Sequence, residues 1–364
     1  MVSTSKFQNS KNAAASAAVR FPGVVKKQWK MRVGSHCSGW LAESQALDKL
    51  CIPHDIVFAC DSKPAVKTLI QNNFNVLHWF DDMQDTPVGQ MPGSLDLYTC
   101  GFPCQPYSSA GRNQGLADDR STPMNAMLEY IDMHRPHMII LENVANFASR
   151  HKQVFARLVN YLRSLQEYRV HHRVLNTADY GVPQNRKIIY IVVIKRRLLR
   201  LPFQWPKPIQ LAPLSKFWDR DRCGVIVKNQ SIPDELLLGK TSSQNLLTTF
   251  KKLRAQNMVP RQTDAVADIG ASSRFSSLQV GKCPTITAGR AKSAGYYATK
   301  LQRRLSLKEL MRLQGCNPSR LNTSVISDTQ LGAIIGNAMS INVMEAVIAQ
   351  MMTAIGGIEA MPID

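Results

Sequence analysis

The sequence predicts an open α/β fold, in which short buried strands alternate with helices and ligands bind at the carboxyl ends of the strands. Apolar runs of strand length alternate with segments of helical periodicity from residue 31 onward. A turn that contains glycine follows the first run, and loops that carry acids or cysteine follow later ones. Such loops lie where open α/β sheets hold their ligands.

Length and charge narrow the class of protein. A chain of 364 residues with 44% hydrophobic content can form one large domain and a smaller one. The formal net charge of +19 favours a polyanionic partner, and nucleic acid is the commonest. No apolar run approaches the length of a membrane span, so we expect no membrane insertion. The eight cysteines are scattered without a Cys-x-x-Cys pair, which predicts reduced thiols inside the cell and no metal site.

The first 30 residues have a composition of their own. Residues 1–32 contain seven lysines or arginines and no acid, and the first acid of the chain is Glu43. This pattern fits a basic disordered arm that contacts phosphates, or an organellar targeting segment. The two alternatives stay open, and the segment 1–30 is excluded from the predicted fold.

Two βα units open the folded part. Residues 31–35 form a predicted strand, and the turn Cys37-Ser38-Gly39-Trp40 leads into a helix over 41–50. A strand, a glycine turn and a helix start form a common cradle for an adenosyl ligand, because the backbone approaches the ligand there. A second strand, 55–60, ends at Asp61, 22 positions after Gly39, close to the offset at which an acid binds ribose hydroxyls. An N-cap role for Asp61 explains the spacing equally well.

The most informative stretch runs from Leu95 to Ser108. An apolar run that suits a buried strand breaks into a loop, Gly101-Phe102-Pro103-Cys104-Gln105-Pro106. A buried structural cysteine is the ordinary interpretation of an arbitrary cysteine. The two prolines argue against it here, because they fix the loop and direct its side chains. Residues 111–120, polar and with glycine, are predicted to form a lid over the site.

A second signature follows the predicted strand 137–141. It is Glu142-Asn143-Val144, and Gln184-Asn185-Arg186 comes later between two predicted strands, 168–175 and 187–194. Together with Pro103-Cys104-Gln105, these motifs resemble those of cytosine-5 DNA methyltransferases and occur in the family's order. The likeness covers roughly residues 31–355. Gly336-Asn337-Ala338, before a helix predicted over 340–352, resembles the family's last motif.

The resemblance implies a fold and a division of the chain. The fold is a doubly wound, mostly parallel sheet with one reversed strand, the S-adenosylmethionine-dependent methyltransferase fold. The catalytic domain then comprises residues 31–195 and 303–364. Residues 196–302, rich in loops and basic residues, form a smaller target-recognition domain. A helix that begins at Ser306 and ends before Gly315 returns the chain to the catalytic domain.

The resemblance also implies site residues. Cys104 is the nucleophile, Glu142 the partner of ring nitrogen 3, and Asn143 and Arg186 hold the exocyclic amine and the ring oxygen. Ile188 stands where the family has a second arginine. S-adenosyl-L-methionine is expected to bind at Cys37, Ser38, Gly39, Trp40, Asp61, Ser62, Asp82, Met83, Gly101, Pro103, Asn337 and Ala338.

Two of these cofactor positions carry reservations. The family's Phe-x-Gly-x-Gly turn aligns with Cys37 to Leu41 and keeps only the first glycine; the indole of Trp40 is expected to replace the missing apolar wall. Taken alone, the acidic loop around Asp82 is more typical of a solvated surface.

The predicted function is therefore DNA (cytosine-5-)-methylation through a covalent Cys104 adduct on a flipped-out cytosine. Double-stranded DNA is the expected partner and the protein is expected to be a monomer. The alternatives are a tRNA methyltransferase of the same fold, and an impaired module that binds nucleic acid or cofactor without turnover. Residues 196–302 lack the Cys-Phe-Thr signature of the tRNA branch. We expect an intracellular protein, nuclear if it is eukaryotic, with an organelle as the alternative.

Overall fold

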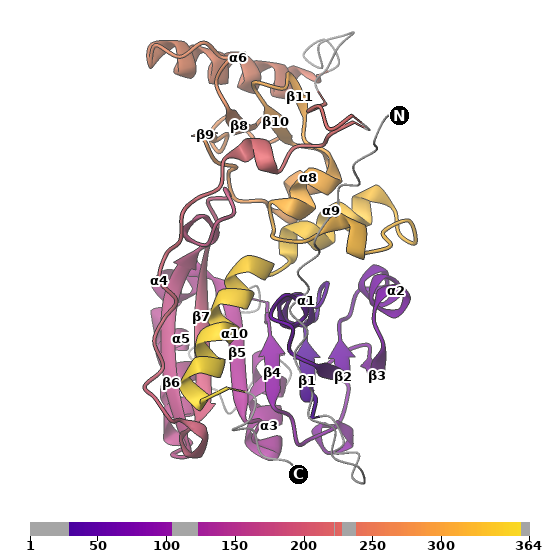
Figure 1. Ribbon diagram of the computed structural model, residues 1–364, viewed down its shortest axis with the longest axis vertical. Coiled ribbons are helices and arrows are strands. Elements are labelled where there is room, and N and C mark those ends of the chain that lie inside the picture. Colours follow the sequence, from indigo (N-terminus) through magenta and orange to yellow (C-terminus); the bar gives the residue numbers. More distant parts are fainter. Residues whose placement is uncertain (1–28, 104–122, 222, 228–237, 358–364) are drawn as a thin grey trace, which may run out of the picture.

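A large mixed sheet forms the centre of the computed structural model, which describes residues 29–103, 123–221, 223–227 and 238–357 (Figure 1). The seven strands have the order β3-β2-β1-β4-β5-β7-β6. Only β7 runs against its neighbours, so the predicted mostly parallel sheet with one reversed strand is confirmed. The strands are β1 (Met31–His36), β2 (His54–Cys60), β3 (Val76–Phe80), β4 (Leu97–Cys100), β5 (Met138–Val144), β6 (Tyr168–Asn176) and β7 (Lys187–Lys195).

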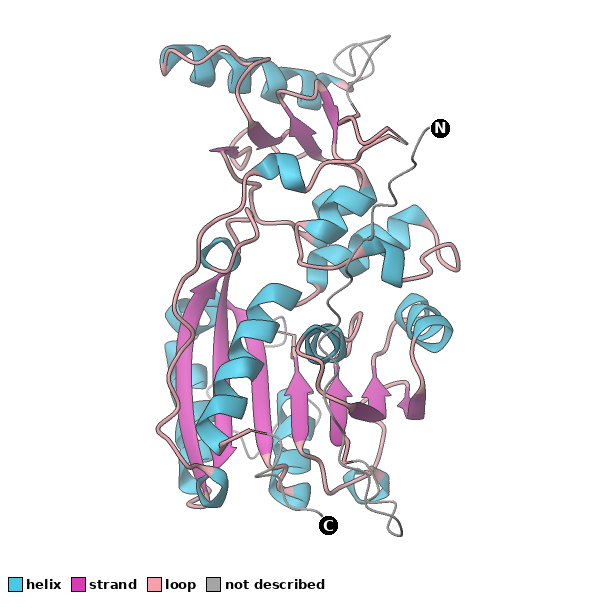
Figure 2. Ribbon diagram, in the orientation of Figure 1, coloured by secondary structure: helices cyan, strands magenta, loops and turns pink. Residues whose placement is uncertain are grey.

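Helices cover both faces of this sheet (Figure 2). On one face lie α1 (Ala42–Lys49), α2 (Pro64–Asn73) and α10 (Ile341–Ile355); on the other lie α3 (Pro123–His134), α4 (Ala145–Arg150) and α5 (Lys152–Ser164). Side chains of β5 alternate between the two cores, Met138 and Ile140 facing α10 while Ile139 and Leu141 face α3. Burial on both faces explains why these strands are continuously apolar in sequence.

A second, smaller sheet lies beyond the carboxyl ends of β1, β2, β4 and β5 (Figure 1). Its antiparallel strands are β8 (Ala265–Asp268), β9 (Leu278–Val280), β10 (Tyr296–Ala298) and β11 (Arg303–Arg304), in the order β11-β10-β8-β9. Leu246 of α6 (Lys240–Ala255) packs against this sheet beside Tyr297. The strand β11 lies beyond the 196–302 boundary, and the amides of Arg200 and Leu201 donate to the Ala354 carbonyl of α10, so the domain limits stay a prediction.

Three helices connect the two sheets: α7 (Ala288–Ala291), α8 (Leu307–Arg312) and α9 (Asp328–Asn337). The predicted start of α8 is confirmed, since the Ser306 hydroxyl and the Glu309 carboxylate form a reciprocal capping box. Glu309 also holds the guanidinium of Arg303 through two hydrogen bonds of 2.9 and 2.7 Å. The chain therefore returns from the small sheet through a firmly bonded corner.

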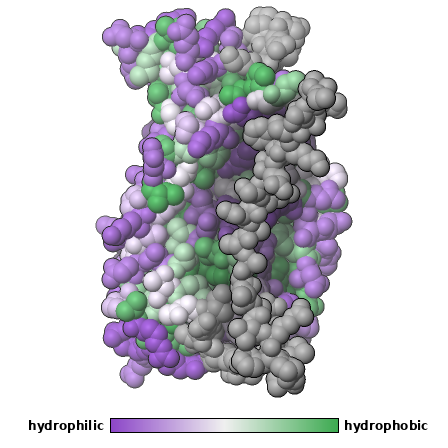
Figure 3. Space-filling view, in the orientation of Figure 1, coloured by the Kyte–Doolittle hydropathy of each residue, from purple (hydrophilic) through white to green (hydrophobic). Residues whose placement is uncertain are grey.

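Sequence reasoning missed one feature of the C-terminal region. Residues 328–355 are long and apolar enough to cross a membrane, although 78% of the most apolar window is buried inside the protein. The stretch is two helices, α9 and α10, separated at residues 338–340. Burial of this kind is typical of core helices. Figure 3 shows hydrophilic residues along the margins of the molecule and hydrophobic ones nearer the middle of the visible face.

Candidate active site

Glu142 is the central carboxyl group of the site. The strand β5 continues through Glu142 to Val144. Glu142 and Asn143 therefore lie inside the strand, whereas the sequence predicted that the strand ends at residue 141. Glu142 is 8% exposed and lies directly opposite Tyr190 of β7. Burial raises the pKa of Glu142 to about 7, although the nearby Arg186 opposes the rise. A carboxylic acid with such a pKa can donate a proton near neutral pH.

The cysteine loop begins beside this acid. At Gly101 an added Cβ would lie 3.4 Å from the Glu142 Oε2 atom and 4.0 Å from the Cys37 carbonyl oxygen. Gly101 thus brings the end of β4 against both the acid and the turn after β1. Pro103 is exposed and is the last residue of this loop that the structure describes. The predicted nucleophile Cys104 and the predicted lid, 111–120, lie outside the described residues.

Asn143 is hydrogen-bonded within the protein. Its amide nitrogen donates to the Phe102 carbonyl at 2.9 Å, and its side-chain oxygen accepts from the Val144 amide at 2.8 Å. Both ends of the side chain are therefore used within the protein. Asn143 therefore holds the backbone at Phe102, and its contact with the exocyclic amine of the substrate stays a prediction.

Arg186 is also engaged with the protein. Its Nη1 atom donates to the carbonyls of Ile286 at 2.8 Å and Gly336 at 3.2 Å, and Nη2 donates to Ala338 at 3.1 Å. Only Nε, which is buried, has no partner. The terminal nitrogens are thus bonded within the protein, and the contact of this guanidinium with the substrate oxygen stays a prediction. Ile188, where the family has a second arginine, is 4% exposed and packs in the core.

Two residues near the acid were not singled out from the sequence. Tyr190 is 1% exposed, and its hydroxyl has no hydrogen-bond partner among the described residues. The Glu142 carboxyl group contributes, after burial, to the raised pKa of this phenol. Met339 lies on the other side, with its methyl group 3.8 Å from the Cβ that Gly101 lacks. Only the strand register, which pairs Tyr190 with Glu142, could have pointed to the tyrosine.

The turn after β1 has the backbone shape of a ligand cradle. Cys37, Gly39 and Leu41 all have positive φ angles, of 52°, 55° and 55°. Ser38 fixes the turn, because its amide and hydroxyl both donate to the Cys60 carbonyl at 3.0 and 3.1 Å. A Cβ at Gly39 would meet nothing within 4 Å, so there is open space beside this backbone. Leu41, which aligns with the second glycine of the family's turn, thus has a left-handed backbone conformation that glycine adopts readily.

The N-cap of α2 is Lys63 and not Asp61, so the N-cap alternative is not what the structure shows, and binding of ribose hydroxyls by Asp61 stays a prediction. One carboxylate oxygen accepts from the Gly39 amide at 3.1 Å, and the other accepts from the Lys63 amide at the start of α2. The acid is half-buried, and so joins the turn after β1 to the helix after β2. Ser62 beside it is exposed.

Other predicted cofactor residues fall into two groups. The Cys37 thiol lies 3.9 Å from the Met83 sulfur, which connects the turn after β1 with the loop after β3, where half-buried Asp82 lies. Trp40, by contrast, is 1% exposed within the core, and its indole nitrogen has no partner. Its indole therefore does not form the apolar wall of an open site.

The last motif supplies backbone more than side chains. Asn337 ends α9 with an exposed side chain, while the buried Ala338 gives its carbonyl to Arg186. Next to it runs a buried polar network that sequence reasoning missed. It joins the loop before β7 to α8 and α10 through Gln184, Gln314, Ser340 and Thr177. Two glutamines in separate motifs were the only signal for it.

The fold and the site together define a doubly wound α/β methyltransferase. Among the described residues, no group of His, Cys, Asp and Glu is arranged to hold a metal ion. Two solved structures share the fold: Dnmt2 of S. pombe (TM-score 0.57, 16% identity, covering 89% of this chain and 99% of that one) and a DNMT2 mutant of Spodoptera frugiperda (0.62, 16%, 89% and 100%).

Sequence comparison narrows this class to one family. The model of the family described as C-5 cytosine-specific DNA methylase matches residues 32–353. The type II methyltransferase M.NgoBI of Neisseria gonorrhoeae is 31% identical over 271 residues, 73% of this chain and 77% of its own. M.HaeII of Haemophilus aegyptius is 29% identical over 300 residues, 82% and 86%. The chain belongs to this family of DNA cytosine-5 methyltransferases.

Proposed function

We propose that the protein methylates carbon 5 of a flipped-out cytosine in double-stranded DNA, through a covalent adduct with Cys104 and with S-adenosyl-L-methionine as methyl donor. The observation that carries this proposal is the buried acid Glu142. Its pKa is raised to about 7, and its carboxyl group lies beside Gly101, in the backbone that leads to Cys104. The resemblance of the motifs supplies the role of the cysteine.

The proposed chemistry begins at carbon 6 of the ring. The Cys104 thiolate forms a bond to carbon 6 while protonated Glu142 donates to ring nitrogen 3, so electrons move onto carbon 5. Carbon 5 accepts the methyl group, then loses its proton to solvent. The electrons of that bond re-form the ring double bond and expel the thiolate, and nitrogen 3 returns its proton to Glu142.

Glu142 must carry a proton to begin this sequence. With a pKa of about 7, it is partly protonated at neutral pH and increasingly ionised above it. We expect methyl transfer to decline as the pH rises through this value. Asn143 contributes by holding the Phe102 carbonyl, and with it the loop.

The residues around Gly39 suit the proposed cofactor. The positive φ angles at 37, 39 and 41 and the open space at Gly39 let a ligand approach the backbone closely. Asp61 would hold hydroxyl groups, and the Met83 side would contact the base. When bound, S-adenosyl-L-methionine supplies an electrophilic methyl group.

A duplex is the proposed form of the DNA. Carbon 5 of a paired cytosine is covered inside the helix stack, so the base must leave it, at a cost of a few kcal/mol. The net charge of +19 favours phosphate contacts that offset this cost.

Two measurements test the proposal. The first is transfer of labelled methyl from S-adenosyl-L-methionine to duplex DNA, with tRNA in parallel. We expect label on DNA for the wild type and for Cys51→Ala, which removes an exposed thiol, and none for Cys104→Ala. If only tRNA carried the label, the substrate would be tRNA and the proposal of a DNA substrate would be rejected.

The second measurement tests the covalent step. A duplex with 5-fluorocytosine at the target base cannot lose a proton from carbon 5, so the adduct cannot resolve. We expect a band that survives denaturing electrophoresis and disappears in Cys104→Ala but not in Cys51→Ala. Binding of DNA and cofactor without label or adduct would identify an impaired binding module instead.

A further inference from the structure

The chain carries an uneven run of charge next to the catalytic strand. From Asn143 to Ala178 there is a single acid, Glu167. The same stretch has six basic residues: Arg150, Lys152, Arg157, Arg163, Arg169 and Arg173. The stretch forms α4, α5 and β6, the last strand of the large sheet.

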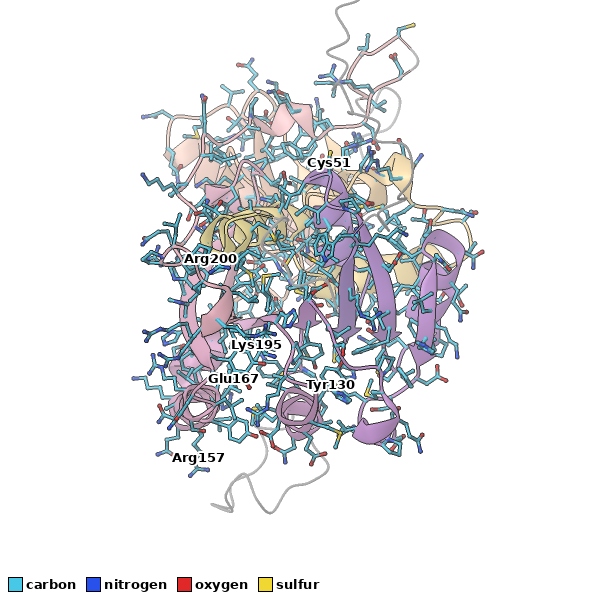
Figure 4. All side chains as sticks on the ribbon, turned by 60° about the horizontal axis from the view of Figure 1, so that its bottom comes forward. Cys51, Tyr130, Arg157, Glu167, Lys195 and Arg200 are labelled. Atoms are coloured by element: carbon cyan, nitrogen blue, oxygen red, sulfur yellow. The ribbon has the colours of Figure 1, made fainter. Side chains whose placement is uncertain are left out.

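Five of these residues lie along this edge of the large sheet, which we call the basic edge: Lys152, Arg157 and Arg163 on α5, with Arg169 and Arg173 of β6. The two β6 arginines lie on the face of the strand opposite α5, since His172 contacts Phe155 of α5 while Arg173 lies over Trp205. All five are exposed. With 3.6 residues per turn, the exposed positions of α5 cover an arc of about 140°, and the others on it are uncharged. Figure 4 shows Arg157 at the rim of the molecule, pointing outward.

The acids nearest the basic edge are paired with other cations. Glu167 contacts Arg135 at 3.3 Å and Lys195 at 3.8 Å, and Asp132 also pairs with Arg135. Within the described part of the chain, no carboxylate forms an ion pair with a basic-edge residue. The carboxylates of the described residues therefore leave the positive charge of this surface unpaired.

Two histidines report this charge independently. Burial and the guanidinium groups of Arg169 and Arg163 lower the pKa of His171. Burial and Arg163 likewise lower the pKa of His172. The Arg173 guanidinium lies over the Trp205 ring, 5.8 Å from the centroid. The basic edge thus resists further positive charge and would attract an anion.

Protection of an edge strand from pairing is a simpler explanation for two of the residues. Charged side chains on edge strands commonly prevent strand addition, and β6 is an edge strand. That explanation covers Arg169 and Arg173. It does not cover the uncompensated charges of α5, which lies on the face of the sheet.

The basic edge is continuous with the catalytic edge. Helix α4 directly follows Asn143 and Val144, and α5 then leads away from that end of the sheet (Figure 1). From Lys152 to Arg163 the helix rises about 16 Å, the length of about five base pairs. We propose that the basic edge binds the phosphate backbone of duplex DNA beyond the target site. This inference rests on one part of the proposed function, namely that the protein binds duplex DNA.

The experiment compares two duplexes that contain the same target cytosine, of 14 and 40 base pairs. The variant Lys152→Gln/Arg157→Gln/Arg163→Gln removes three charges from α5. A control, Lys251→Gln/Lys252→Gln/Arg254→Gln, removes three exposed charges from α6, on the far side of the small sheet (Figure 1). Dissociation constants are measured from 50 to 300 mM salt, after thermal melting has shown that both variants are folded.

We expect the α5 variant to bind the 40-base-pair duplex about tenfold or more weakly and the 14-base-pair duplex like the wild type. Its salt slope on the long duplex should fall by about 2.7, because each of the three lost phosphate contacts removes about 0.9. Equal affinity of the variant and the wild type for the long duplex overturns the proposal. So does an equal loss in the α6 control, or a loss confined to a 40-base-pair RNA duplex. Absence of methyl transfer with these binding results intact would reject the proposed function alone.

Discussion

Replacing Glu142 with glutamine should make the free protein more stable at high pH while it abolishes methyl transfer. The acid is buried, and its pKa is raised from 4.5 to about 7. A rise in pKa means that ionised Glu142 is less stable in the folded protein than in the unfolded chain. Glutamine keeps the shape of the protonated acid and cannot ionise, so the variant avoids this cost.

The size of the effect follows from the two pKa values. A change from 4.5 to about 7 corresponds to about 3 kcal/mol of unfolding free energy, at 1.36 kcal/mol per pH unit. The folded protein holds the proton more tightly, so Glu142 destabilises it progressively as the pH rises from about 4.5 to about 7. Below that window both states are protonated and the cost is absent; above it the full cost remains.

Urea unfolding of the wild type and Glu142→Gln at pH 5, 6, 7 and 8, without cofactor or DNA, measures this difference. We expect the variant to gain on the wild type by about 2.5 kcal/mol between pH 5 and pH 8, because a small part of the cost is already present at pH 5. The control Glu129→Gln makes the same change at an exposed position of α3 and should show no comparable trend. A gap for Glu142→Gln that stays constant, or grows toward low pH, would refute the assignment of a raised pKa to this acid.

Three further substitutions test local geometry, each by urea unfolding. Because Leu41 has a φ of 55°, Leu41→Gly should be about 1 kcal/mol more stable than Leu41→Ala, and the opposite order would contradict the left-handed backbone. Gly336→Ala should cost about 2–3 kcal/mol, since its Cβ would lie 2.1 Å from the Ala288 nitrogen; an unchanged stability would exclude this close packing. Tyr190→Phe should be neutral or stabilising by up to about 1 kcal/mol because the hydroxyl has no partner, and a clear loss would reveal one.

Most of the large sheet could be predicted because its signals are local. Strand lengths, glycine turns and helix periodicity appear within a few residues, and the resemblance supplied the reversed β7. The end of β5 was misplaced, because Glu142 and Asn143 looked like loop residues. In the structure they continue the ladder, paired with Tyr190 and Ile189 of β7. No residue pattern within the β5 segment indicates that β7 pairs with it in the antiparallel direction.

The candidate site divides in the same way. Gly39 and Asp61 were paired by their spacing, and their hydrogen bond of 3.1 Å agrees with it. The hydrogen bonds of Arg186 within the protein were not predicted, because its acceptors come from distant parts of the chain. Ile286, Gly336 and Ala338 lie 100, 150 and 152 positions away in sequence. A motif shows which residue type is present but not which carbonyls it meets.

The turn after β1 shows why a lost glycine need not mean a lost site. A left-handed leucine costs roughly 1–2 kcal/mol, and burial of the Leu41 side chain in the core contributes roughly 1.5–3 kcal/mol in return. Hydrogen bonds from Ser38 to Cys60 and from Gly39 to Asp61 hold the turn from the other side. The shape of the turn is therefore imposed by its neighbours, so the residue-type signature understates how much of the ligand cradle this chain retains. By the same reasoning the missing arginine at Ile188 is the more serious departure, because no described guanidinium terminus of Arg186 is free to replace it.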